Sequence, residues 1–283
     1  SGAVMTKVKS GISRMQAMGT FLKLGTCSET VVNLLDRAFD NPLVLEENAS
    51  QPLAGGIMQH GYQCGMIWGA SLAAGAQAYK IFGAGPEAET RAIIASQRLV
   101  ESFQVRHNTF NCLEITDIDK SSSTMKMIFV FLIKGGTIGC FRMAGWYAPI
   151  ALNDIQNTLS EKNIEVPASP VSCASMLAQK MGMSDKHALM VAGFAGGIGL
   201  SGGACGALGA AIWILGMKSK EETGKVDFKN PKAQDKIDRF LECTNFKFEC
   251  SEIVGRKFEN VNDHAAHLCG GGCRDIIEVL ANG

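Results

Sequence analysis

Ten cysteines are the residues of this 283-residue chain that could do chemistry, because a cysteine thiolate is both a nucleophile and a metal ligand. An even count in a secreted chain usually indicates disulfides, but this chain is far longer than the small domains that need them. The polar N-terminus has no apolar segment typical of a signal peptide. Ser1-Gly2 could be the remnant of a tag, so a leader that has been removed is still an alternative. We therefore expect a reducing cytoplasm, where metal binding or thiol chemistry is the better use for cysteine.

The cysteines recur in the same order in two halves of the chain. Residues 55–65 align without a gap with residues 196–206, and six of these eleven positions are identical. One cysteine lies upstream of the central one, by 37 residues before Cys64 and by 32 before Cys205. Another lies downstream, by 48 and 45 residues, and a further cysteine follows near a helical tail. This order predicts a tandem duplication, with one unit at 1–150, a second at 151–283 and a seam near Pro149.

Both central cysteines stand where a glycine-rich turn gives way to a predicted helix. A helix N-terminus presents free N–H groups and partial positive charge, which favours a thiolate, and small neighbours let other backbone approach the sulfur. A buried, inert cysteine beside a close helix crossing is the alternative for either residue alone. Residues 197–202 also fit the dinucleotide pattern G-x-G-x-x-G, but no strand is predicted before them and the first copy has Met58 in place of the middle glycine.

The cysteine spacing restricts the kind of site. Zinc ribbons and ferredoxins use short C-x-x-C loops, whereas successive cysteines here are tens of residues apart. Each thiol would then arrive on a different helix end, and the site would form only in the folded protein. Four converging thiolates could bind an iron–sulfur cluster or tetrahedral zinc, or form disulfides.

The C-terminus carries a second group of candidates. His264, His267 and Cys269 could ligate a metal, and Cys269 could pair with Cys273 across three glycines. The first half has no match for the two histidines, so a polar helix with exposed histidines is the main interpretation. Cys243 has no counterpart either and is expected to pack in the interior.

Apolar periodicity predicts an all-α fold of two homologous helical bundles packed about a pseudo-two-fold axis. The predicted helices cover residues 12–22, 27–39, 65–81, 151–162, 173–181, 206–217 and 232–241. The apolar run Met127–Ile133 is ambiguous between a buried helix and a strand.

Composition excludes several classes of function. The 27 basic and 27 acidic side chains balance, so no electrostatic footprint for nucleic acid is present. Two long uncharged stretches, 48–79 and 188–217, are too rich in glycine for membrane spans and lack the usual flanks. We expect a soluble protein of unknown oligomeric state, for which a homodimer is one possibility.

The second half resembles the family described as "putative redox-active protein" and named for its C-GCAxxG-C-C cysteine pattern. The resemblance lies in Cys173-Ala174, in Gly193–Ala211 with Cys205-Gly206-Ala207, and in Cys250 and Cys273. The first half matches more loosely, with Cys27-Ser28 and Cys64-Gly65-Met66 at the corresponding positions. A related domain in split-Soret cytochromes is associated with an iron–sulfur centre, so the resemblance implies iron–sulfur binding and a redox role.

The resemblance implies one set of cluster ligands in each half. Ligands from both halves could also share one site. The first set is Cys27, Cys64, Cys112 and Cys140, and the second is Cys173, Cys205, Cys250 and Cys273, with Cys269 a rival for Cys273.

The leading hypothesis is thus an iron–sulfur protein that acts in electron transfer with an unknown redox partner protein, or as the redox site of an oxidoreductase. A thiol–disulfide oxidoreductase that uses Cys269 and Cys273 is one alternative. A zinc-stabilised helical interaction module is the other.

Overall fold

The computed structural model describes residues 8–116, 121–123, 125–126 and 136–283. In these ranges the backbone forms 14 α-helices and two 3₁₀ helices, and strand-like pairing is limited to two isolated bridges. The predicted all-α class is therefore confirmed. The apolar run 127–133 lies outside the described residues.

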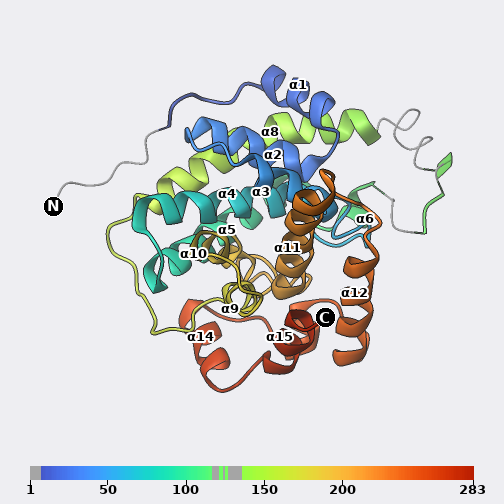
Figure 1. The fold of residues 1–283 in the computed structure, drawn as a ribbon. Coiled ribbons are helices and arrows are strands. Elements are labelled where there is room, and N and C mark those ends of the chain that lie inside the picture. The colour runs from blue at the N-terminus through green and yellow to red at the C-terminus, as the bar shows by residue number, and fades with distance from the viewer. Residues whose placement is uncertain (1–7, 117–120, 124, 127–135) are drawn as a thin grey trace.

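The first half, blue to green in Figure 1, lies above the second half, yellow to red. Its elements are α1 (Arg14–Leu24), α2 (Cys27–Ala38), α3 (Val44–Ala49), η1 (Gln51–Leu53), α4 (Gly65–Phe82), α5 (Pro86–His107), α6 (Cys112–Thr116) and α8 (Gly136–Leu159). Those of the second half are α9 (Cys173–Lys180), α10 (Asp185–Met190), η2 (Ala192–Phe194), α11 (Gly206–Thr223), α12 (Pro231–Cys243), α13 (Cys250–Val254), α14 (Val261–Cys269) and α15 (Arg274–Ala281).

The central part of the two halves has the same layout. The elements α3, η1 and α4 correspond to α10, η2 and α11 residue for residue, so that residue 44 matches 185 and residue 82 matches 223. Trp68 on α4 and Trp213 on α11 are both completely buried, as their predicted place in the core requires. The duplication seen in the sequence is therefore also a duplication of helices.

The contacts between the halves are reciprocal. Helix α4 packs on α10 and η2 of the second half, and α11 packs on the equivalent α3 and η1 of the first half. A Cβ on Gly75 of α4 would lie 2.6 Å from the carbonyl oxygen of Met190, and one on Gly216 of α11 would lie 2.7 Å from that of Ala49. Met190 and Ala49 each end the corresponding short helix. Such exchange of equivalent contacts is what a two-fold relation produces.

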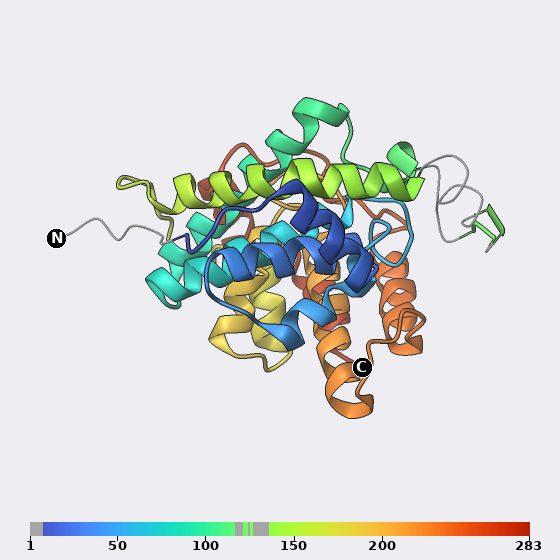
Figure 2. The ribbon, with the colours of Figure 1, turned by 90° about the horizontal axis from the view of Figure 1, so that it is seen from above.

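Helix α8 departs from the sequence-based description. It runs unbroken from Gly136 to Leu159 through Pro149, the position of the predicted seam, and it includes most of the helix predicted over 151–162. Figure 2 shows α8 extended along the first half, and it packs against α1, α2 and α5. A proline inside a helix removes one backbone hydrogen bond, a loss that this packing offsets. The division at residue 150 stays a prediction.

In the described part of the chain, no helix combines the length and the apolarity that crossing a bilayer would take.

Candidate metal centres

Each half contains a glycine-rich turn with the same unusual backbone. Six residues of each turn have positive φ, between 47° and 85°, at equivalent positions. They are Gly55, Gly56, Ile57, Met58, Gln59 and Gly61 in the first half, and Gly196, Gly197, Ile198, Gly199, Leu200 and Gly202 in the second. Glycine is required where the turn closes on itself, because a Cβ on Gly56 or Gly197 would lie 2.3 Å from backbone atoms of Tyr62 or Gly203. These turns, rather than a strand, lead into α4 and α11.

After each turn, the backbone pairs with the segment that carries the downstream cysteine. In the first half, Cys64 N–H donates to the carbonyl oxygen of Phe110 (2.7 Å), and Cys112 N–H donates to that of Tyr62 (2.6 Å). In the second half, the same pattern joins Cys205 to Phe248 at 3.0 Å and Cys250 to Gly203 at 2.7 Å. The two isolated bridges lie here, at Gln63–Asn111 and at Ala204–Glu249. This pairing brings cysteines together that are 48 and 45 residues apart in the sequence.

The upstream cysteine of the first half contacts the central one directly. Cys27 begins α2, and a Cβ on Gly65 would lie 2.6 Å from its sulfur, so only glycine fits after Cys64. The pKa of Cys27 is lowered, mainly by a hydrogen bond from the Cys64 thiol and also by backbone hydrogen bonds from Gly55 and Ser28. The same thiol–thiol bond, together with burial, raises the pKa of Cys64 well above its ordinary value.

The other two first-half cysteines face this pair. Burial and the nearby charge of Cys27 raise the pKa of Cys112 to about 11. Burial, followed by the charges of Cys27 and Cys112, raises the pKa of Cys140 on α8 to about 12. The four predicted cysteines of the first half therefore lie close enough for their charges to interact. We call this group the first thiol cluster.

The second thiol cluster consists of Cys173, Cys205, Cys250 and Cys273. Burial raises the pKa of Cys173, although backbone hydrogen bonds, the first from Gly196, oppose it. Burial and the charge of Cys173 raise the pKa of Cys205 to about 12, against hydrogen bonds from the first turn of α11. The pKa values of Cys250 and Cys273 are also raised, by burial and then by the charges of the other members.

A helix N-terminus favours the thiolate forms of Cys64 and Cys205, as expected, but the pKa values of both thiols are raised overall. Helix N–H groups do bond to both sulfurs and lower their pKa values. Burial in an apolar interior, together with neighbouring cysteines, outweighs that effect. Glycine N–H groups approach the sulfurs of Cys27 and Cys173 instead, at the matching positions Gly55 and Gly196.

The remaining C-terminal candidates separate clearly. Cys269, at the end of α14, is exposed, whereas Cys273 lies with the second thiol cluster. The ring of His264 is buried, its Nδ1 lies 2.9 Å from the carbonyl oxygen of Val171, and burial lowers its pKa to about 4. His267 Nε2 lies 3.8 Å from the Cys273 sulfur, so of the two histidines this one contacts the cluster.

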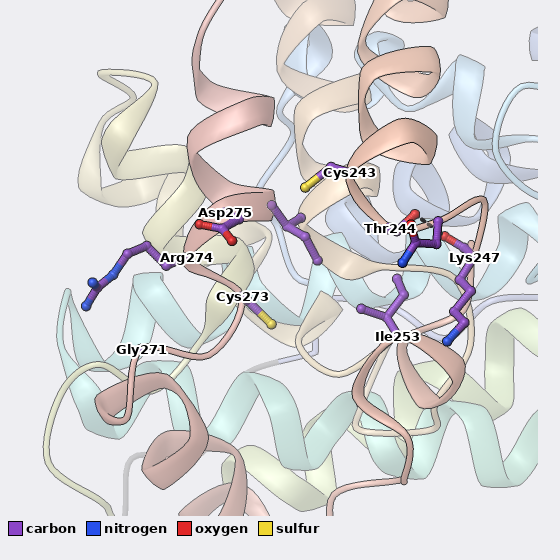
Figure 3. Close-up of a pocket in the computed structure, with 10 residues that line it drawn as sticks. Cys243, Thr244, Lys247, Ile253, Gly271, Cys273, Arg274 and Asp275 are labelled. Atoms are coloured by element: carbon purple, nitrogen blue, oxygen red, sulfur yellow. Dashed lines mark hydrogen bonds between the residues drawn. The ribbon is translucent and has the colours of Figure 1, made fainter.

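A cavity of about 410 Å³ opens beside the second thiol cluster. Figure 3 shows Cys273 and Cys243 in its wall, together with Ile253 of α13 and the polar residues Thr244 and Lys247. Cys243 is partly buried, so its predicted packing role is only partly met. Of the four cysteines in the second thiol cluster, Cys273 is the member that lines this cavity.

Four cysteines in each thiol cluster are the number and kind of donor that an iron–sulfur cluster takes. Among the described residues, no three His, Cys, Asp or Glu side chains are arranged to hold one metal ion. Tetrahedral zinc needs four sulfurs about 2.3 Å from one point, whereas in an iron–sulfur cluster the four thiolates are divided among two or four irons. Four cysteine thiols in each half, two of them with N–H groups directed at the sulfur, are donor chemistry that such a cluster uses.

Sequence reasoning missed one residue of this region. Gln63 is completely buried between the two halves, and its amide nitrogen bonds to carbonyl groups of the second half. The only sequence signal is its position directly before Cys64, where the second half has Ala204.

A search of curated proteins and one of solved structures gave no match to this chain. The model of one protein family does match, at residues 26–150 and again at 171–282, so the two matches divide the chain as the two thiol clusters do. The chain belongs to the C_GCAxxG_C_C family, which is described as "Putative redox-active protein", and carries two copies of its domain.

Proposed function

We propose that this protein binds an iron–sulfur cluster at each thiol cluster and transfers electrons, either to a partner protein or within an oxidoreductase. The observation that carries the proposal is the gathering of four thiols from four separate segments in each half, with backbone N–H groups bonded to two of the sulfurs in each half. Iron–sulfur clusters are held by cysteine thiolates, and burial and N–H···S bonds set their potentials.

In the first half, Cys27, Cys64, Cys112 and Cys140 would hold the cofactor, and Cys173, Cys205, Cys250 and Cys273 would hold it in the second. A bound cluster would supply one-electron chemistry. The protein keeps water away from the buried sulfurs and directs the N–H groups of Gly55 and Gly196 at Cys27 and Cys173. The cavity beside Cys273 supports the second cluster as the end that meets a partner or small electron acceptor.

The test is anaerobic purification from an iron-replete host, followed by an absorption spectrum and analysis of iron, sulfide and zinc. The proposal predicts a brown protein with iron and sulfide in equal amounts and little zinc. Replacing Cys243 with serine, in the cavity wall but outside both clusters, should leave these values unchanged. A colourless protein without iron, or one that holds zinc alone, would contradict the proposal.

A second function, thiol–disulfide exchange, is supported by one observation. Cys27 has a lowered pKa and accepts a hydrogen bond from Cys64, so its thiolate could attack a substrate disulfide and Cys64 could then displace the mixed disulfide. The substrate disulfide would be reduced to two thiols, and Cys27 and Cys64 would be oxidised to one disulfide. This observation favours Cys27 and Cys64 over Cys269 and Cys273, the pair expected from the sequence. Reduction of a small disulfide by an equal amount of the reduced, metal-free protein, lost in Cys27→Ser, would support it.

A further inference from the structure

One side chain joins the two cysteine turns. The Gln63 amide nitrogen donates to the carbonyl oxygens of Gly197, at 3.0 Å, and Ala204, at 3.3 Å. Gln63 directly precedes Cys64, and Ala204 directly precedes Cys205. A short path of peptide and hydrogen bonds therefore runs from one central cysteine to the other.

The surroundings of Gln63 fix the orientation of its amide. Reversing the amide would place its oxygen against two carbonyl oxygens, which cannot donate. A Cβ on Gly203 would lie 2.2 Å from the amide nitrogen, so glycine is needed there to admit this side chain. The amide oxygen is buried and has no hydrogen-bond partner among the described residues. Burying an oxygen without a hydrogen bond lowers stability. The two hydrogen bonds to the second half offset this cost and keep the side chain in place.

A ring stack reinforces the connection. Tyr62 and Phe248 stack with ring centroids 4.2 Å apart and planes 8° apart. The carbonyl oxygen of Tyr62 accepts the N–H of Cys112, and that of Phe248 accepts the N–H of Cys205. Tyr62 and Phe248, which bond to cysteines of different thiol clusters, are therefore in direct contact. A displacement of one turn would shift the other through this contact.

We propose that Gln63 couples the two thiol clusters, so that filling one increases the affinity of the other for its cofactor. This inference rests on the proposed function. A cofactor orders the turn whose cysteine it binds, and through Gln63 the second turn is ordered as well, so the second binding event carries a smaller entropic cost. Coupling of this kind is reciprocal and is commonly worth 5- to 150-fold in affinity.

The experiment is anaerobic reconstitution with limiting iron and sulfide, with empty, singly filled and doubly filled chains counted by native mass spectrometry. In the unaltered protein, empty and doubly filled chains should dominate. Gln63→Met keeps the length of the side chain but removes the donor. At half-saturation it should increase the singly filled fraction by about 1.6-fold to 7-fold, the range that follows from losing a 5- to 150-fold coupling. An unchanged singly filled fraction would overturn the coupling.

Trp213→Phe is the matched control. The indole nitrogen of Trp213 donates across the halves to the carbonyl oxygen of Glu46 at 2.9 Å, and neither residue adjoins a cysteine. This variant loses one buried hydrogen bond between the halves, but it should leave the distribution of filled chains as in the unaltered protein. If it raises the singly filled fraction as much as Gln63→Met does, general loosening of the halves explains the effect and the coupling by Gln63 is wrong.

If the unaltered protein takes up no cofactor at all, the proposed function fails, and amide exchange of the metal-free protein decides the coupling. Gln63→Met should then speed exchange in residues 196–205 as well as in 55–64. Faster exchange confined to 55–64 would contradict it. Gly203→Ala, which displaces the Gln63 amide from the other half, should have the same effects and replaces Gln63→Met if that variant does not fold.

Discussion

The two thiol clusters share a backbone but differ in how their sulfurs meet. In the first cluster, Cys64 donates a hydrogen bond to Cys27, whose pKa is lowered. In the second, the pKa of the equivalent Cys173 is raised by burial, and Cys205 influences its neighbours through charge alone. Beside the same glycine-rich turn, the pKa of the upstream cysteine is therefore lowered in one half and raised in the other.

The fourth cysteine separates the clusters further. Cys140 lies inside the long helix α8, which packs across the first half. Cys273 instead has φ 62° at the start of α15, next to His267 and in the wall of a cavity. The duplicated segment preserves three positions of the site. The fourth comes from α8 in the first half and from the start of α15 in the second, and these helices pack on equivalent partners (α2, α4 and α5; α9, α11 and α12). In the second cluster Cys273 therefore lines a cavity, whereas in the first cluster three thiols, Cys27, Cys112 and Cys140, are partly exposed.

The largest expected effect concerns the glycine after each central cysteine. A Cβ on Gly206 would lie 1.9 Å from the carbonyl oxygen of Phe194, a backbone atom that cannot move alone. Gly206→Ala should therefore lower the free energy of unfolding by about 3 kcal/mol or more. In Gly65→Ala the closest atom is the Cys27 sulfur, so the loss should be smaller, about 1–3 kcal/mol.

Urea denaturation of both variants measures this difference. Gly19→Ala is the control, because no atom lies within 4 Å of the added Cβ and alanine favours the helix. Equal losses for Gly206→Ala and Gly65→Ala would show that the two turns have the same packing, against the comparison drawn above.

A second prediction concerns alkaline pH. In the metal-free protein the pKa of Cys205 is about 12 against an ordinary 9.0, so its contribution to stability is complete below pH 9 and is lost as pH rises from 9 towards 12. All members of the second cluster shift in the same direction. The urea midpoint should fall between pH 8 and 10.5, and Cys205→Ala should flatten this fall more than Cys27→Ala does. A midpoint independent of pH would contradict the burial of these thiols.

A third prediction concerns thiol reactivity, because a thiolate rather than a thiol is alkylated. Cys27 is partly exposed and has a lowered pKa, whereas Cys205 is buried and has a raised one. In reduced, metal-free protein at pH 8, iodoacetamide should modify Cys27 at least about tenfold faster than Cys205. Peptide mapping by mass spectrometry gives both rates, and equal rates would remove the electrostatic distinction between the clusters.

Much of the architecture could be predicted from the sequence, because helices leave local signals. The helix predicted over 206–217 is α11, and it extends to Thr223 because Lys218–Glu222 are polar residues that favour helix at its exposed end. The helix predicted to start at residue 151 starts earlier, because α8 continues through Pro149 and packs on α1, α2, α4 and α5. Propensity alone does not include such tertiary contacts.

The composition of the clusters was predictable only in part. The shared order of cysteines in the two halves assigns seven of them to a cluster. It does not decide between Cys269 and Cys273 as the eighth, because that depends on the left-handed backbone of Cys273 after the glycine run. The lowered pKa of Cys27 and the reach of Gln63 depend on neighbours that are distant in the sequence. Contacts of that kind leave no periodic pattern.

The central claim is that the chain has two separate four-thiol sites, and the iron content of cysteine variants at saturating iron and sulfide tests it most directly. Cys64→Ser and Cys205→Ser should each retain about half of the iron of the unaltered protein, since serine is a poor ligand for these clusters. The double variant should bind none, and Cys269→Ser should bind as much as the unaltered protein. Full iron content in Cys205→Ser, or loss of iron in Cys269→Ser, would contradict the two sites.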